Sequence, residues 1–303
     1  MTTHGLRRVA AGLLAMTASV CAQSPDKKVN LRVTLVNEGM VLGRLERYKG
    51  DDTAREATLR QMFLEAGCPE AQVTEQAVPQ LGQPNVLCVL PGSGPKTIVV
   101  GANFDHVAEG DGVIDNWSGA SMLPSLMQSL QSAPRAHTFV FVGFAGLHWK
   151  STGSKFYVSQ LTGERLKEID AMVDLDMLGL GPTMLWAKRT DLRLAGSLMQ
   201  MADDMKLPLG VVDLAGEADE APFTKKHVCT VVVHSVTYEN AQVIHGPEDN
   251  YKAVHWEDYF ASYRLMAAYL TKLDGSSVPQ NYTCKGLPVD VTTWRGLGRL
   301  LKP

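Results

Sequence analysis

Apolar runs alternate with helical patterns along most of the chain. Nearly every position is apolar in five runs, which we predict as buried strands: 85–92, 96–104, 137–144, 171–180 and 230–236. Apolar residues at helical spacing fall around them, at 51–67, 118–131, 153–161 and 258–273. Strands that are apolar on both sides and alternate with helices are typical of a sheet covered on both faces. We therefore predict an α/β fold, a three-layer α/β/α sandwich around a central, mostly parallel mixed sheet.

The first 22 residues have the pattern of a signal peptide. Arg7 and Arg8 precede a short apolar stretch, and small residues near Cys21 offer a cleavage site. Cys21 as a lipid anchor is the alternative, but the bulky Val20 before it disfavours a lipoprotein. The predicted organisation is a signal peptide at 1–22, one domain at 23–274 and a C-terminal tail at 275–303. We expect a periplasmic or secreted protein.

The composition of the chain limits the kinds of partner that we expect. The net charge of the 303 residues is −3 and no basic block occurs, so no nucleic-acid partner is expected. No later run reaches the ~18 apolar residues of a membrane span, so stable membrane insertion after signal removal is not expected. Four cysteines follow the signal, which permits two disulfides in an oxidising compartment. The four cysteines are Cys68, Cys88, Cys229 and Cys284. Cys68 and Cys88 are the favoured pair because they flank one helix-to-strand connection. The alternative is that all four are buried, unpaired thiols.

Acidic residues and histidines recur where the predicted strands end. Taken singly, each has an ordinary structural explanation as a cap, a turn residue or a surface histidine. The carboxyl ends of parallel strands converge on one crevice, however, and carboxylates and imidazoles gathered there are what a metal site needs. The residues in question are Asp105, His106, Asp115, His148, Asp174, Asp176, Asp219, Glu220 and His245.

Two other motifs are excluded. The segment GSGPKT at 92–97 lacks the spacing of a phosphate-binding loop, and a strand follows it where a helix is required. The segment NWSGAS at 116–121 is not the nucleophile turn of a serine hydrolase.

Several segments together resemble metallopeptidase family twenty-eight, which includes aminopeptidase Y and bacterial leucyl aminopeptidases and is related to glutaminyl cyclases. VVGANFDHV resembles the family's VVGAHFDHV, and GDGVIDNWSGAS resembles its loop with a bridging aspartate. Four further segments of this chain resemble those that carry the family's remaining acidic and histidine residues. They are HTFVFVGF with GSKFYV, AMVDLDMLG, ADEAPFTKKHVCTVVVHS and VIHGPEDN. The resemblance covers residues 36–274 and implies a zinc-exopeptidase fold.

The resemblance also implies a pair of zinc ions that share Asp115. One ion would take its other ligands from a histidine at position 103 and from Asp176. The second ion would take them from a glutamate at position 148 and from His245. A further glutamate of the family would serve as the general base.

Three of these six positions carry another residue, although the segments around them match. Position 103 is Asn103, a poor zinc ligand because zinc prefers nitrogen, sulfur or carboxylate donors. The general-base position is Leu147, which cannot accept a proton. Position 148 is His148, which with Asp115 and His245 would form a two-histidine, one-carboxylate zinc site.

One zinc ion is therefore favoured over two, and a site without metal is the other alternative. Glu109, Glu217 and Glu220 on predicted rim loops are the candidates to replace the missing base. Asp105 and Asp219 are expected to support the site or to hold the ammonium group of a peptide substrate.

Two functions follow from these residues. The first is an exported zinc-dependent aminopeptidase that removes residues from a free N-terminus, weakened by the replaced residues. The second is a catalytically inactive relative that keeps the fold as a binding or interaction module. Metal content and aminopeptidase activity distinguish them.

Overall fold

The computed structural model describes residues 1, 33–214, 216–276, 279 and 282–287. The predicted signal peptide and the end of the predicted tail therefore lie outside the described residues. Eight strands form one sheet in the order β1-β2-β4-β3-β5-β8-β6-β7. Their bounds are β1 Val73–Gln76, β2 Asn85–Leu90, β3 Thr97–Asn103, β4 Thr138–Phe144, β5 Ile169–Leu175, β6 Thr183–Trp186, β7 Leu209–Val212 and β8 Thr230–His234.

The sheet is mixed, as predicted. Strands β4, β3, β5 and β8 run parallel to one another at its centre, and β6 pairs with β7 in parallel. The pairs β1–β2, β2–β4 and β6–β8 are antiparallel. The five strands that the apolar runs predicted are neighbours in the sheet, in the order β2-β4-β3-β5-β8.

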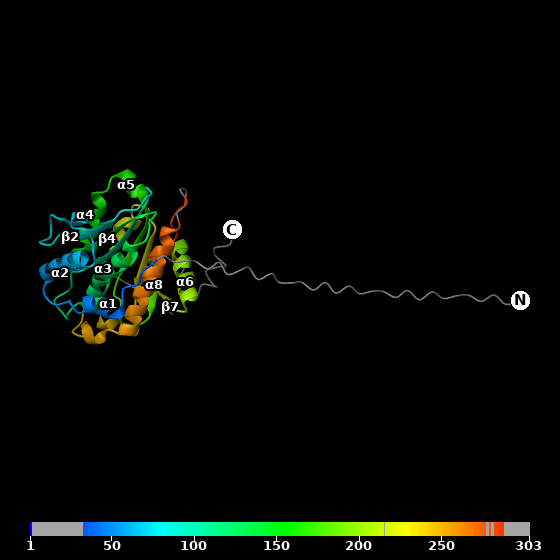
Figure 1. Cartoon of the computed structure of the whole chain (residues 1–303). Coiled ribbons are helices and arrows are strands. Elements are labelled where there is room, and N and C mark those ends of the chain that lie inside the picture. Colours follow the sequence, from blue (N-terminus) through cyan, green and yellow to red (C-terminus); the bar gives the residue numbers. More distant parts are fainter. Residues whose placement is uncertain (2–32, 215, 277–278, 280–281, 288–303) are drawn as a thin grey trace. The chain divides into compact units, whose positions relative to one another are not determined.

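Helices cover both faces (Figure 1). Alternate strand residues point to opposite sides, so Val100 packs in the larger core and Val99 in the smaller one. Helices α1, α2, α3, α6 and α8 contribute side chains to the larger core, whereas α4 and α7 cover the other face. The bounds are α1 Glu38–Leu45, α2 Asp52–Glu65, α3 Ser118–Gln131, α4 Thr152–Ser159, α5 Gly163–Glu168, α6 Leu192–Met205, α7 Ala221–Thr224 and α8 Trp256–Asp274. The three-layer α/β/α prediction is confirmed.

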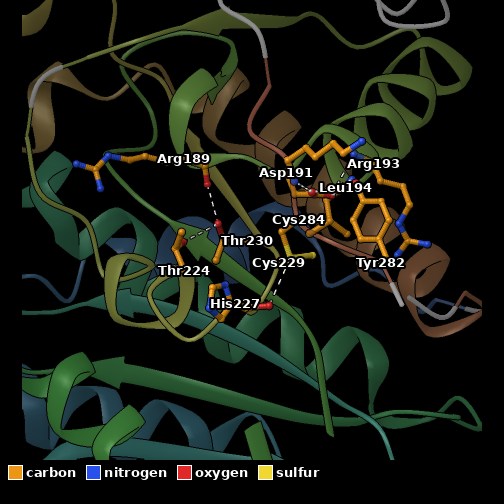
Figure 2. Close-up of a disulfide and its surroundings, with 11 residues drawn as sticks. Arg189, Asp191, Arg193, Leu194, Thr224, His227, Cys229, Thr230, Tyr282 and Cys284 are labelled. Atoms are coloured by element: carbon orange, nitrogen blue, oxygen red, sulfur yellow. Dashed lines mark hydrogen bonds between the residues drawn. A yellow bond between two sulfur atoms is a disulfide. The ribbon is translucent and has the colours of Figure 1, made fainter. Parts of the chain in front are cut away.

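Two disulfides tie the outer segments to the sheet. Cys68 is bonded to Cys88 on β2, which confirms the favoured pair, and Cys229 is bonded to Cys284. Figure 2 shows the second bond beside Asp191, whose carboxylate accepts hydrogen bonds from the Tyr282 hydroxyl at 3.0 Å and the Lys285 amide at 2.8 Å. Within the predicted tail, the described residues 282–287 are thus held against the start of α6.

A buried ionic group lies at the opposite end of the parallel strands from the predicted site. His137 precedes β4, and its Nε2 atom lies 3.2 Å from Asp170 Oδ2 while its Nδ1 atom lies 3.4 Å from Asp274 Oδ1. Burial alone would lower the pKa of His137, but the two carboxylates raise it. This cluster joins the beginnings of β4 and β5 to the end of α8.

Among the described residues, no helix is long and apolar enough to cross a membrane.

Candidate active site

A cavity of about 260 Å³ opens where the central strands end. Its walls come from the loops that follow β3, β4, β5 and β7, from the end of β6 and from residues 244–245. Four of the nine acidic and histidine residues named from the sequence line it, namely Asp115, His148, Asp176 and His245, at the carboxyl edge of the parallel strands, where ligands bind in α/β folds. The lining residues are Asp115, Leu147, His148, Asp176, Met177, Trp186, Gly216, Glu217, Ile244 and His245.

Three of these side chains converge on one point. His148 Nε2 lies 3.2 Å from His245 Nε2. Asp115 Oδ2 lies 2.8 Å from His245 Nε2 and 3.7 Å from His148 Nε2. Ligands of a tetrahedral zinc ion, at bond lengths of about 2.0–2.1 Å, lie about 3.3 Å from one another. The three separations therefore fit one face of a zinc tetrahedron.

The charges of this group depend strongly on one another. Burial alone would raise the pKa of Asp115, but His148 and His245 lower it to about 2. Burial alone would lower the pKa of His148, but hydrogen bonds to Asp105 and Asp115 raise it to about 10. The hydrogen bond to Asp115 also raises the pKa of His245. Two nitrogens 3.2 Å apart cannot both direct a proton at each other, so at most one of the two Nε2 atoms donates along this line.

Asp105 orients His148. Its Oδ2 atom accepts hydrogen bonds from the backbone amide and from Nδ1 of His148, each at 3.0 Å, and its Oδ1 atom accepts the Leu147 amide at 3.0 Å. When Nδ1 donates to a carboxylate, the neutral ring has its lone pair on Nε2, where a metal ion would bind. Asp105 thus holds the ring of His148, the residue at the position of the family's expected glutamate.

Asn103 is fully engaged by its neighbours. Its Nδ2 donates to Asp105 Oδ1 at 3.3 Å, and its Oδ1 accepts a hydrogen bond from Asn116 Nδ2 at 2.9 Å. Asn116 also accepts the amides of Gly119 and Met177, at 3.1 and 3.0 Å. The carboxamide oxygen of Asn103 is thus used within the protein and is not directed at a metal.

Sequence reasoning missed two residues that hold the loop around Asp115. Asp249 Oδ1 accepts the Ile114 amide at 2.6 Å, and its Oδ2 accepts the Asp115 amide at 3.2 Å. Arg55 on α2 is 1% exposed and donates to the carbonyl of Gly112 at 3.2 Å and to the carbonyl of Asp111. Asp249 lies in the quoted segment VIHGPEDN, four residues after His245, so its position was available in the sequence although its role was not.

Four carboxylic acids are buried beside the cavity. Neither oxygen of Asp176 has a hydrogen-bond partner among the described residues, and burial together with the Asp115 carboxylate raises its pKa well above the ordinary value. Burial and the nearby acids also raise the pKa of Asp174, and they raise that of Asp219 to about 8. Glu220 forms an ion pair with Arg189 at 2.6 Å, although burial still raises its pKa. Of these four, the cavity reaches Asp176.

The candidate replacement bases differ in position. Glu109 is exposed and is not among the residues that line the cavity, and neither is Glu220. Glu217 does line it, together with Leu147. His106, which also follows β3, pairs with Asp52 at 2.9 Å and is likewise outside the lining.

Several known proteins are similar to this chain in sequence or in fold. Aminopeptidase YwaD from Bacillus subtilis is 31% identical over 98 residues, which are 32% of this chain and 21% of that protein. The LapA aminopeptidase of Legionella pneumophila superposes with a TM-score of 0.70 at 17% identity, covering 80% of this chain and 73% of that one. A glutaminyl cyclase from an Acidobacteriales bacterium superposes with a TM-score of 0.65 at 16% identity, covering 84% and 99%.

At these identities the solved structures establish the fold, and the matched region spans about a fifth of the length of aminopeptidase YwaD. The family itself is established by the sequence model for peptidase family M28, which matches residues 85–270. That range includes the loops that carry Asp115, His148 and His245. The chain belongs to peptidase family M28.

Proposed function

We propose that this protein is a zinc-dependent aminopeptidase whose centre binds one zinc ion through Asp115, His148 and His245. The convergence of these three side chains is the observation that carries the proposal. Bound there, zinc would lower the pKa of water and polarise the substrate carbonyl. An open fourth position is typical of catalytic zinc sites with three protein ligands.

The same contacts argue against a second ion of the family type. Asn103 has both ends of its carboxamide bonded to Asp105 and Asn116, so a second ion would find only Asp115 and Asp176. Asp176 is buried with both oxygens free of hydrogen bonds. That state is expected of a ligand whose ion has been lost.

The cavity suits the N-terminal residue of a peptide. Leu147, Met177, Trp186 and Ile244 give it apolar walls that would bury an apolar first side chain. Asp176 is the buried carboxylate that such a substrate would meet with its ammonium group. Asp219, which the sequence suggested for this role, is outside the lining and would act as support for the acidic cluster.

We also propose that the protein acts after export, through a signal peptide at residues 1–22. The two disulfides support this proposal because such bonds persist in oxidising compartments. A relative in Mycobacterium tuberculosis carries the name probable lipoprotein aminopeptidase LpqL, which agrees with an extracytoplasmic location for that protein.

A non-catalytic binding module is the second candidate. Leu147 at the family's general-base position is the observation that favours it, because loss of a general base lowers rates about 10²–10⁴-fold. Under this alternative the cavity would still take a ligand, but no peptide bond would be cleaved.

Metal content and turnover decide between the two. Purified mature protein would be loaded with zinc, dialysed, analysed by mass spectrometry and assayed on a panel of aminoacyl substrates with and without chelator. About one zinc per chain and chelator-sensitive turnover are expected. His245→Ala should abolish both, whereas the control Glu109→Gln, an exposed residue outside the cavity, should change neither. Zinc-free, inactive protein would refute the proposal.

A further inference from the structure

The proposed reaction needs a group that removes a proton from the attacking water. Three carboxylates line the cavity: Asp115, Asp176 and Glu217. Asp115 is committed to the two histidines. Asp176 is 2% exposed, whereas Glu217 is exposed to solvent. Glu217 is thus the carboxylate that water can reach without entering the core.

Glu217 is also linked through Ser151 to the turn that carries Leu147. Ser151 Oγ donates a hydrogen bond to Glu217 Oε2 at 3.4 Å. The backbone amide of Ser151 in turn donates to the Leu147 carbonyl at 2.8 Å. Leu147 and Glu217 therefore face one cavity from two loops, and Ser151 joins the glutamate to the turn that contains Leu147.

The loop that carries Glu217 is anchored on both sides. Arg189 donates to the Gly216 carbonyl on one side and pairs with Glu220 at 2.6 Å on the other. The guanidinium of Arg189 lies 4.4 Å from the ring centre of Trp186, which is itself a wall of the cavity. These contacts position the backbone on either side of Glu217, and the Ser151 hydrogen bond directs its carboxylate, as the positioning of a catalytic group requires.

We infer that Glu217 is the general base of this protein and takes the part that a glutamate at position 147 plays in the family. The inference rests on the proposed aminopeptidase function. In the first step the water O–H bond breaks, the proton passes to the Glu217 carboxylate, and the oxygen bonds to the peptide carbonyl carbon. In the second step the C–N bond breaks, and Glu217 returns the proton to the leaving amine. No other reactant is consumed.

Moving the carboxylate from position 217 to position 147 tests whether Glu217 is the general base. Glu217→Gln should lower kcat by roughly 10²–10⁴-fold with KM nearly unchanged. Zinc content should be unchanged, and so should the affinity for a peptide with a reduced, uncleavable first bond, measured by calorimetry. Adding Leu147→Glu to Glu217→Gln should then recover at least tenfold in kcat, because a carboxylate again faces the cavity. Glu109→Gln is the matched control and should retain wild-type turnover.

The outcomes separate the two hypotheses. Wild-type-like turnover by Glu217→Gln overturns the inference but leaves the aminopeptidase proposal intact. So does loss of turnover in Asp176→Asn while Glu217→Gln stays active. Zinc-loaded wild type that is inactive until Leu147→Glu is introduced also overturns it, because Glu217 then does not replace the base. A wild type that binds neither zinc nor the uncleavable peptide refutes the proposed function, and the inference with it.

Discussion

Replacing Asp105 by Asn should both destabilise the protein and weaken its zinc site. The carboxylate is 3% exposed, and its two oxygens accept four hydrogen bonds from Asn103, Leu147 and His148. In Asp105→Asn one oxygen becomes an NH₂ group, so whichever way the amide is turned, two buried donors lose their acceptor. Each unsatisfied donor costs about 1–3 kcal/mol, and we expect a loss of about 3 kcal/mol in the free energy of unfolding.

Urea unfolding of zinc-free Asp105→Asn, followed by circular dichroism, measures that loss. Competition with a chromophoric chelator should show zinc affinity falling about 10–100-fold, the usual effect of removing the partner of a metal-bound histidine. Glu109→Gln removes a carboxylate from the same loop at an exposed position and should do neither. An Asp105→Asn protein within 0.5 kcal/mol of wild type, the ordinary scatter of surface changes, would refute the reasoning, and an unchanged zinc affinity would show that Asp105 does not orient His148.

Three further changes test other parts of the structure. Because its carboxylate partners raise the pKa of His137, the protonated ring stabilises the fold below about pH 6.5, and this stability is lost as pH rises through the higher folded value. The difference in melting temperature between wild type and His137→Gln should therefore shrink from pH 6 to pH 9, and a constant difference would contradict this. Changing both Cys229 and Cys284 to Ser opens a 55-residue loop and should cost about 4 kcal/mol in urea unfolding; a loss below 1 kcal/mol would contradict this. Asn103→His restores a nitrogen ligand beside the unbonded Asp176 and should raise zinc content from about one to two ions per chain, which mass spectrometry would show; a ratio that stays at one would contradict the assignment of the lost site.

The elements predicted from sequence are those buried on both faces. Strands β3 and β4 are apolar at almost every position, which is unambiguous for a central strand. Strand β1 (VTEQ) is mostly polar because it pairs on one side only, and β7 (LGVV) is partly exposed throughout. Short edge strands of this kind owe their conformation to the neighbouring strand, so periodicity alone does not identify them.

The site was predictable as far as topology determines it. Parallel strands deliver their carboxyl ends to one edge, and this alone brings together Asp115, His148 and His245. Topology does not determine the direction in which a side chain within a loop points. Glu217 and Glu220 are three residues apart, yet one faces the cavity and the other pairs with Arg189. Tertiary hydrogen bonds set this difference, and no local pattern encodes them.

The replaced family positions form one connected arrangement rather than scattered losses. Asn103 donates to Asp105, Asp105 accepts both the amide and the ring nitrogen of His148, and His148 meets Asp115 and His245. Asp176, the lining acid that a second ion would have used, has no hydrogen-bond partner among the described residues, and neither do Asp219 and one oxygen of Glu220. The three proposed zinc ligands Asp115, His148 and His245 are all paired. This pairing is what the proposed one-zinc centre requires. With Leu147 and His148 at the two positions where the family is expected to have glutamates, Glu217 is the exposed carboxylate that lines the cavity.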